Sequence, residues 1–162
     1  MTVIAKVAPD EIPALSHLAT AIMREHYDPI VGKAQNDYML EKFQSEPAIK
    51  EQIAGGYRYY FVKSDGKNVG FMAFYPRDGK MYISKFYLSK EFRGRGISKE
   101  MLAFVKAEAR REGFLKIYLN VNKYNSGSIA AYRRLGFYKL FDEVNDIGNG
   151  YVMDDYVLEC DV

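Results

Sequence analysis

The feature that most restricts the fold is a strand, turn, helix and strand run in the second half of the chain. Aromatic and β-branched residues predict a strand at 82–88, and an apolar stripe at helical spacing predicts a helix at 98–112. Residues 115–121 return to strand composition. Two neighbouring strands of one sheet that are joined through a helix run parallel. The run therefore predicts a parallel strand pair.

The region before this run predicts consecutive antiparallel strands. Residues 57–62, 69–75 and 82–88 have strand composition, and Asp65-Gly66 and Asp78-Gly79 between them are hairpin signals. The other predicted elements are a strand at 3–7, helices at 11–23, 36–43, 47–53 and 126–135, and strands at 138–144 and 151–158. The fold class is α/β, or α+β by some schemes, with a mixed and mainly antiparallel sheet of six to seven strands.

Composition narrows the class of protein. With 162 residues, 48% of them hydrophobic, we expect a single domain over 1–162. A net charge of +2, with basic and acidic residues interleaved, argues against a nucleic-acid partner. The lone Cys160 cannot form an intrachain disulfide. No apolar run suits a signal peptide or a membrane span, so we expect a cytoplasmic protein without membrane contact.

A glycine-containing turn joins the 82–88 strand to the helix that follows. Its sequence is Phe92-Arg93-Gly94-Arg95-Gly96-Ile97-Ser98. Glycines allow close backbone approach, and the first N–H groups of a helix attract anions, so a pyrophosphate would fit. An ordinary loop with surface arginines is the alternative. The dinucleotide motif would need a glycine where Lys99 stands, and the P-loop motif is absent.

Three segments, in this order, resemble the GNAT acetyltransferase superfamily. Arg93, Gly96 and Ser98 match its pyrophosphate signature Arg/Gln-x-x-Gly-x-Gly/Ala, with Ser98 in place of the usual glycine or alanine. The preceding 86–88 segment resembles the family's splayed fourth strand. Residues 125–137 resemble its closing helix. More loosely, the segment 120–137 and the C-terminal region resemble PaiA-like members.

The resemblance implies acetyl-CoA as cosubstrate, no metal, and a splayed parallel strand pair with helices on both faces of the sheet. The pantetheine arm would pair with 86–88 and 120–122, and the N–H of Leu88 would stabilise the oxyanion of the tetrahedral intermediate. The implied coenzyme-binding residues are Phe86, Tyr87, Leu88, Arg93, Gly94, Arg95, Gly96, Ile97, Ser98, Asn120, Asn125, Ser128 and Tyr132.

Tyr132 lies where the family places a tyrosine beside the coenzyme sulfur, so it is a candidate catalytic residue. A phenol of pKa about 10 would give its proton to a thiolate of pKa about 8.5 at a cost of roughly 2 kcal/mol. The resemblance therefore implies hydrogen-bond stabilisation of the thiolate rather than complete proton transfer. The alternative is a core aromatic residue beside Leu135 and Phe137.

The general base is not apparent. Ser84 stands where many family members carry a strand glutamate, and a serine cannot act as a base, although it could hold a water molecule. His26 and Glu25, near the end of the first helix, are the alternatives, and His26 is a candidate catalytic residue. A helix-end histidine is equally compatible with a surface role.

The resemblance implies transfer of acetyl from acetyl-CoA to a primary amine, by direct attack on the thioester. The acceptor would be a small amine, a polyamine or a protein amino group. Acidic residues in the last strands, among them Asp154 and Asp155, would suit a cationic acceptor or could be solvated turn residues. A non-catalytic acetyl-CoA sensor and an interaction protein are the alternatives. From family behaviour alone, a homodimer is a plausible assembly.

Overall fold

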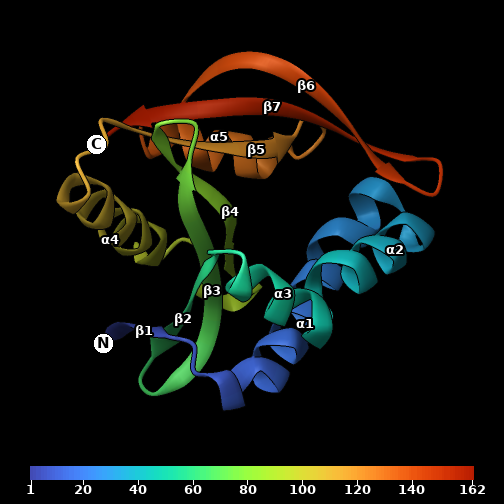
Figure 1. Ribbon diagram of the computed structural model, residues 1–162, viewed down its shortest axis with the longest axis horizontal. Helices are drawn as coiled ribbons and strands as arrows, with labels where there is room; N and C mark the ends of the chain where they lie inside the picture. Colours follow the sequence, from blue (N-terminus) through green and yellow to red (C-terminus); the bar gives the residue numbers. More distant parts are fainter. The chain divides into compact units, whose positions relative to one another are not determined.

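The computed structural model describes all residues from 1 to 162 (Figure 1). The strands are β1 (Thr2–Lys6), β2 (Arg58–Ser64), β3 (Lys67–Arg77), β4 (Lys80–Leu88), β5 (Lys116–Asn122), β6 (Tyr138–Gly148) and β7 (Tyr151–Asp161). The helices are α1 (Ile12–Val31), α2 (Lys33–Gln44), α3 (Glu46–Ala54), α4 (Ile97–Arg111) and α5 (Ser126–Arg134), with short 3₁₀ turns at Pro9–Glu11 and Lys90–Phe92. The strands form a seven-stranded sheet in the order β1-β2-β3-β4-β5-β7-β6. The predicted fold class is confirmed.

Two compact units make up the chain. The first contains residues 1–75 and 85–101, and the second contains residues 76–84 and 102–162. β4 contributes its first half to the second unit and its C-terminal half to the first. Each unit is described separately below. No helix is both long enough and apolar enough to cross a membrane.

The first unit is built on an antiparallel meander. β1 pairs with β2, and β2 pairs with β3, in antiparallel register. Asp65 and Gly66 have φ values of 49° and 80°, which are the two positive angles that a tight type I′ hairpin requires. Asp78 and Gly79, at 53° and 74°, repeat the arrangement between β3 and β4. Both predicted hairpins are confirmed.

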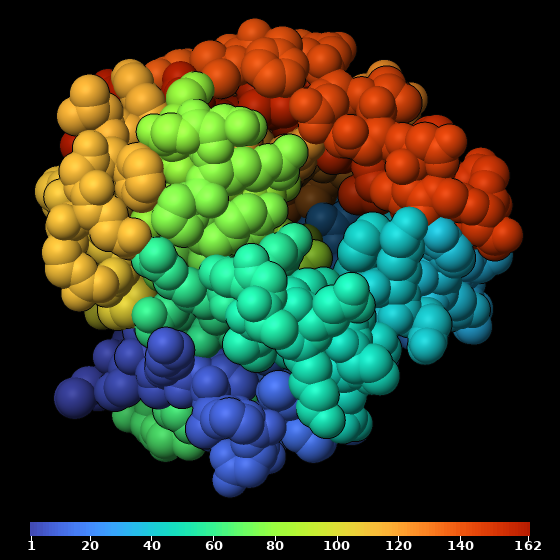
Figure 2. Space-filling model, viewed as in Figure 1, coloured from blue at the N-terminus to red at the C-terminus, as the bar shows by residue number.

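One face of β2 and β3 carries the core of the first unit. The buried apolar residues of this core come from the residue after β1 and from α1, α3, β2 and β3, and they are Val7, Ile12, Leu15, Ala19, Ile22, Ile49, Tyr59, Phe61, Phe71 and Ala73. Leu15, Phe61 and Phe71 are fully buried, so truncating any one of them to alanine would cost about 2–5 kcal/mol. Figure 2 shows α2 and α3 side by side at the surface of this unit.

The first helix is longer than the sequence predicts. We expected it to end at residue 23, but α1 continues to Val31 and ends at Gly32, whose φ is 86°. Pro29 and the polar residues around it interrupt the apolar spacing, so the sequence did not predict the last two turns of the helix. Tyr27 is nevertheless buried, and it continues the apolar face of the helix.

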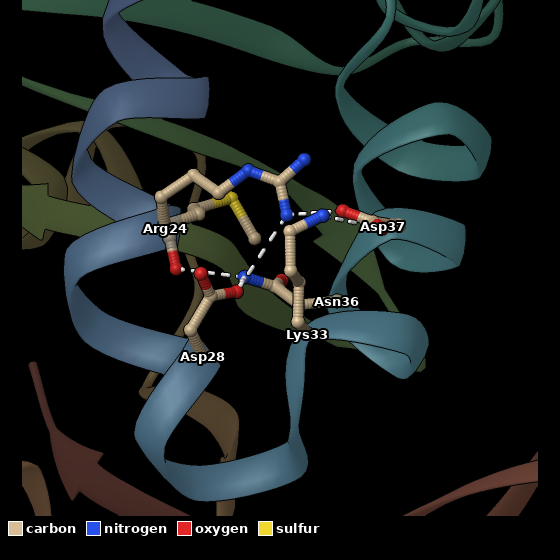
Figure 3. A network of polar contacts seen from close by, with 6 residues as sticks. Arg24, Asp28, Lys33, Asn36 and Asp37 are labelled. Atoms are coloured by element: carbon tan, nitrogen blue, oxygen red, sulfur yellow. Dashed lines mark hydrogen bonds and ion pairs between the residues drawn. The ribbon is translucent and has the colours of Figure 1, made fainter.

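Polar contacts between α1 and α2 stabilise this extension (Figure 3). The buried Asn36 side chain donates to the Met23 carbonyl oxygen at 3.0 Å and to Asp28 Oδ1 at 2.7 Å. Arg24 forms ion pairs with Asp28 and Asp37. These contacts fix the turn of α1 that carries residues 25–27. Because the two Asn36 contacts join residues 8 and 13 positions apart across a helix junction, helical periodicity could not reveal them.

The second unit contains the parallel pair. β4 and β5 pair in parallel register from Met81↔Ile117 to Ile83↔Leu119. β5 then pairs antiparallel with β7, and β7 pairs antiparallel with β6. The β6–β7 hairpin turns at Asn149-Gly150, again with two positive φ angles. β6 extends to Gly148, four residues beyond the predicted end. Most of this strand is exposed, so it lacks the alternating pattern of a half-buried strand.

Candidate active site

The glycine turn follows β4 and opens directly into α4. Gly94 and Gly96 have φ values of 76° and 82°, angles that favour glycine, and Ile97 begins the helix. A Cβ atom placed on either glycine would meet no other atom within 4 Å. The turn therefore leaves open space on both sides of Arg95. Open space, a left-handed backbone and a helix N-terminus together suit a pyrophosphate.

Arg93 is held by the first unit itself. Its Nε donates to the Leu88 carbonyl oxygen at 3.1 Å, and its guanidinium forms a 3.0 Å ion pair with Glu25 of α1. The sequence placed this arginine only as a phosphate ligand. In the structure it also joins the end of β4 to α1. The Arg95 guanidinium lies 5.0 Å from the centre of the Phe92 ring, a cation–π distance.

An aromatic cluster surrounds the end of β4. The hydroxyl groups of Tyr27 and Tyr87 lie 3.1 Å apart, and the Tyr87 ring also packs against Phe71. The His26 ring meets the Tyr27 ring edge-on at 4.8 Å and the Tyr87 ring at 6.3 Å. The structure therefore brings His26 close to the strand segment that the sequence assigned to the thioester. Tyr27 packs in the interior of this unit.

Gly70 of β3 is required by the backbone at the end of β4. A Cβ atom at this position would collide with the Tyr87 carbonyl oxygen and lie 2.8 Å from a methyl carbon of Leu88. The Ser89 N–H donates to the Val69 carbonyl oxygen at 2.8 Å in the same region. A side chain at position 70 would push Leu88 away from its place. Gly70 therefore helps to fix the backbone that would face the thioester.

His26 is partly buried, and burial is the main reason that its pKa lies below the ordinary value of 6.5. The positive charge of Arg93 lowers the pKa further, and Glu25 acts in the opposite direction. The imidazole is therefore neutral at pH 7, with a lone pair on one nitrogen. A neutral imidazole is the form that a general base requires.

Lys85 is a half-buried cation on β4. Burial lowers the pKa of its ammonium from 10.5 to about 8. Its Nζ lies 5.6 Å from the centre of the Phe43 ring of α2. Within the first unit the Lys85 ammonium therefore lies within cation–π distance of an aromatic ring. Sequence reasoning did not single out this residue, because a lysine in a strand usually reaches solvent.

In the second unit, the residues that follow the last parallel pair are the ones that the sequence assigned to the reaction. Ser84 follows Ile83, and Asn120 follows Leu119. Beyond this pair β4 continues to Leu88 and β5 continues to Asn122. The residues that the family resemblance assigns to the pantetheine arm, 86–88 and 120–122, come after this last parallel pair in the sequence of each strand.

Asn120 has several protein partners. Its Nδ2 group donates to Glu143 at 2.9 Å and to Asp155 at 3.4 Å, and its Oδ1 accepts a hydrogen bond from the Tyr82 hydroxyl at 3.2 Å. Asn145 donates to the same Glu143 oxygen. The Asn120 side chain, which the sequence assigned to coenzyme binding, is therefore the centre of a network between β4, β5, β6 and β7.

The two carboxylates of this network differ in their pKa values. Asp155 is 3% exposed, and burial raises the pKa of its carboxyl from 3.8 to about 6, with Glu143 and Asp154 adding to the effect. Hydrogen bonds from Asn145 and Asn120 hold the pKa of Glu143 below its ordinary value. Both groups are therefore ionised at pH 7. The sequence could have suggested Asp155 as an inward-facing residue, because it alternates with the buried Val157 along β7.

Asn125 and Ser128 have a structural role at the start of α5. The Asn125 side chain accepts a hydrogen bond from the Ser128 N–H, which makes it the N-cap of the helix. Tyr132, on the same helix, packs edge-on against Phe137 at 5.5 Å and is only half-buried. Its ring thus has the packing role considered above, and it stays partly accessible.

Two other features lie outside these clusters. A groove is lined by residues of α1, α2 and α3 with the loop between them, and none of the predicted site residues contributes to it. Cys160 is buried, and burial raises the pKa of its thiol to about 11, so it is not a reactive nucleophile. No group of three or more His, Cys, Asp or Glu side chains is arranged to hold a metal ion.

The comparison with protein families decides the identity of the fold. Residues 20–137 match the model of the acetyltransferase (GNAT) family. The chain belongs to this family. It is therefore a GNAT N-acetyltransferase that uses acetyl-CoA. The matched region includes both the glycine turn and the α5 segment, on which the resemblance rested.

Similar proteins agree with this assignment. An uncharacterized N-acetyltransferase of Lactobacillus delbrueckii subsp. lactis is 24% identical over 142 residues, which cover 80% of this chain and 82% of that protein. A probable spermine N(1)-acetyltransferase of Bacillus subtilis subsp. natto is 31% identical over 62 residues, or 38% of this chain and 41% of that protein. The PaiA N-acetyltransferase of Thermoplasma acidophilum, solved with coenzyme A, has the same fold, with a TM-score of 0.84, 18% identity, and coverage of 100% of this GNAT chain and 99% of that chain.

Proposed function

We propose that this GNAT enzyme transfers the acetyl group of acetyl-CoA directly to a primary amine, and that the acceptor is a small cationic amine. The observation that carries the proposal is the open glycine turn at the start of α4, next to the Leu88 end of β4. Coenzyme chemistry supplies an activated acetyl thioester. The residues of this chain bind it, orient the amine and handle the protons.

The turn is suited to the pyrophosphate of the coenzyme. The backbone N–H groups of residues 94–98 would donate to phosphate oxygens, and the α4 dipole would add partial positive charge. Arg95, beside the two glycines, would contribute a charge-assisted hydrogen bond. The complex of the PaiA relative with coenzyme A supports the same use of the fold.

The acetyl group would lie along the end of β4. The Leu88 N–H would stabilise the oxyanion that forms when the amine attacks the thioester, and loss of one such donor typically costs about 10²- to 10³-fold in turnover. The family resemblance assigns Phe86 and Tyr87 of the first unit, and Asn120 and Asn125 of the second unit, to binding of the coenzyme. The fixed backbone beside Gly70 gives Leu88 the rigidity that this role requires.

The attacking amine must lose a proton. An alkyl ammonium with a pKa of about 10.4 costs roughly 4–5 kcal/mol to deprotonate at neutral pH. His26 is the base that we propose, because its ring is neutral at pH 7 and lies beside Tyr87. Ser84 would hold a water molecule rather than act as a base.

Tyr132 would stabilise the departing thiolate with a hydrogen bond. Replacing it by phenylalanine keeps the packing against Phe137 and removes only the hydroxyl. We expect Tyr132→Phe to lower kcat about 10-fold, because hydrogen bonds to charged groups contribute about 1.5–3 kcal/mol, while the affinity for acetyl-CoA changes little. Steady-state assays of thiol release with varied acetyl-CoA would measure both. An unchanged kcat would contradict the assigned role.

The first experiment is thermal unfolding with and without acetyl-CoA. Ligand at about 100 times its dissociation constant should add roughly 2.7 kcal/mol of stability. Gly96→Glu would place a carboxylate where the pyrophosphate binds and should abolish the shift. Gly66→Glu is the matched control, because Gly66 has nearly the same φ, 80°, and the same open surroundings in the β2–β3 turn.

Wild-type protein and Gly66→Glu should therefore shift equally, and Gly96→Glu should not. Equal shifts in all three proteins would contradict the assignment of the turn. Coenzyme binding without thiol release under any amine would instead identify a sensor.

A further inference from the structure

Two carboxylates face each other across the β6–β7 ribbon. Glu143 and Asp155 are partners in the antiparallel register, and one amide group, Asn120 Nδ2, donates to both. Like charges directly opposite each other in a sheet are destabilising. A single neutral amide does not neutralise two charges. The arrangement is therefore costly for the folded protein on its own.

Asp155 shows the incomplete partnering most clearly. It is 3% exposed, its Oδ2 accepts from Asn120, and its Oδ1 has no hydrogen-bond partner. A buried carboxylate oxygen without a donor normally costs a few kcal/mol, so such atoms call for a ligand or another explanation. Glu143 is half-buried and forms the more accessible member of the pair.

Arg77 and Lys123 are cations of the second unit, and each has partners of its own. Arg77 lowers the pKa of Glu143, but its guanidinium lies over the Tyr82 ring at 4.7 Å and 3.8 Å from Asp78. Lys123 pairs with Asp154 at 2.6 Å. The cluster of Tyr82, Asn120, Glu143 and Asp155 thus contains two carboxylates, and Arg77 is the cation that lowers the pKa of Glu143.

We propose that this cluster binds an ammonium group of the acceptor. This ammonium is a second amino group, distinct from the one that receives the acetyl group. An ammonium has three N–H donors and a compact charge, which two carboxylates and a hydroxyl oxygen can accept. The inference rests on the proposed function and narrows the range of acceptors. It assigns acceptors with at least two cationic amino groups to this enzyme, with Asp155 and Glu143 as specificity-determining residues.

The place of the cluster in the second unit supports this assignment. Asn120 and Ser84 directly follow the last parallel pair of β5 and β4. Tyr82 lies two residues before Ser84 on β4, and residues two apart in a strand share a face. An amine held by the cluster would therefore lie beside Ser84, the strand position where many family members carry a glutamate base.

The test compares n-butylamine with 1,4-diaminobutane as acceptors in a thiol-release assay. Wild-type enzyme should have a KM for the diamine about 10- to 100-fold below that for the monoamine, the range expected for a hydrogen bond between charged groups. Asp155→Asn should raise the KM for the diamine by a similar factor, so that the preference for the diamine over butylamine is largely lost. Glu143→Gln, at a half-buried and therefore more tolerant position, should act in the same direction.

Asp142→Asn is the matched control. It removes the same charge from the same ribbon, but Asp142 is exposed, pairs with Lys139 and lies one residue away from Glu143, on the opposite face. Its KM values should match the wild type. Thermal unfolding confirms that each variant is folded.

The outcomes separate the two proposals. Equal KM values for both amines in the wild type, or an unchanged diamine KM in both Asp155→Asn and Glu143→Gln, would overturn the inference and leave the transferase intact. A loss of kcat for both amines in Asp155→Asn would also overturn it, because Asp155 would then act in proton transfer. Absence of thiol release with any amine would contradict the proposed function itself.

Discussion

Lys85 in the first unit and Asp155 in the second are both charged groups whose ionised form is disfavoured by burial, and their charges are opposite. Burial lowers the pKa of Lys85 to about 8 and raises that of Asp155 to about 6. Lys85 has the Phe43 ring as its neighbour, and Asp155 has one amide group. In both cases burial acts against the charged form, and both groups are nevertheless charged at pH 7.

The difference lies in what surrounds each charge. Lys85 lies beside the Phe43 ring, in the unit that also contains the neutral His26 and the arginines of the glycine turn. Around Asp155 the second unit presents a second carboxylate and amides. We infer that a negatively charged coenzyme matches the first set and a positively charged acceptor matches the second. Neither charge improves the stability of the free protein, so both are best explained by ligands.

The largest expected effect is on kcat, and it tests whether the general base that deprotonates the amine belongs to the first or the second unit. If His26 takes the proton from the amine, His26→Gln should lower kcat by about 10²-fold or more, the usual contribution of a general base. Asp155→Asn should leave kcat nearly unchanged. Parallel measurements of kcat for the two variants with 1,4-diaminobutane distinguish the units, and the reverse result would place the base in the acidic cluster.

The next effect is on stability, through Lys85. Its folded pKa is lowered, so the folded state releases the proton before the unfolded state does, and stability should rise with pH between about 8 and 10.5. Below pH 8 the full cost is present. Lys85→Met should therefore raise the free energy of unfolding at pH 7 by about 3 kcal/mol. Urea titrations at pH 7 and pH 10 measure this gain.

Lys63→Met is the control for this gain. Lys63 is also a half-buried strand lysine, with its Nζ 5.5 Å from the centre of the Phe61 ring. A similar gain in Lys63→Met would show that the added apolar surface, rather than the removed charge, stabilises the protein.

Asp155 should give the opposite dependence on pH. Its folded pKa is raised, so between pH 3.8 and about 6 the unfolded state has lost the proton that the folded state still holds. Its contribution to stability is complete below pH 3.8 and falls by about 3 kcal/mol as pH rises to 6. In Asp155→Asn this component of the decline should disappear. Urea titrations from pH 3.5 to 7 would show the difference, and parallel curves for the two proteins would contradict the assignment.

Local patterns explain why much of the fold was predictable. The helix after the glycine turn was expected at 98–112 and is found at Ile97–Arg111, because its apolar stripe and the following Gly113 are both local signals. The hairpins were predictable because Asp-Gly pairs favour positive φ angles. The parallel pair followed from connectivity alone.

The environments of the candidate site residues were not predictable in the same way. Asp155 lies 35 positions from Asn120, and Tyr27 lies 60 positions from Tyr87. Such contacts depend on strand register and on where α1 ends. The end of α1 could not be predicted because Pro29 lies inside the helix. The sequence therefore identified Arg93 and Asn120 as residues of interest. It could not show that Arg93 is bound to Glu25 or that Asn120 joins two carboxylates.

The smallest expected effect concerns Glu25, the one acidic partner of the glycine turn in the first unit. Its ion pair with Arg93 is well exposed, with side-chain exposures of 39% and 38%, so solvent screens it and its contribution stays below about 1 kcal/mol. Glu25→Gln should leave stability almost unchanged and make the turn more positive. The affinity for acetyl-CoA should then rise by about two- to fivefold at low salt and return toward the wild-type value at high salt, since exposed charges are screened. Calorimetric titrations at two salt concentrations measure the gain in affinity and its loss at high salt.

Weaker binding of acetyl-CoA by Glu25→Gln would show instead that Glu25 positions Arg93 for the coenzyme. The glycine turn would then need the Glu25 carboxylate in order to bind the pyrophosphate.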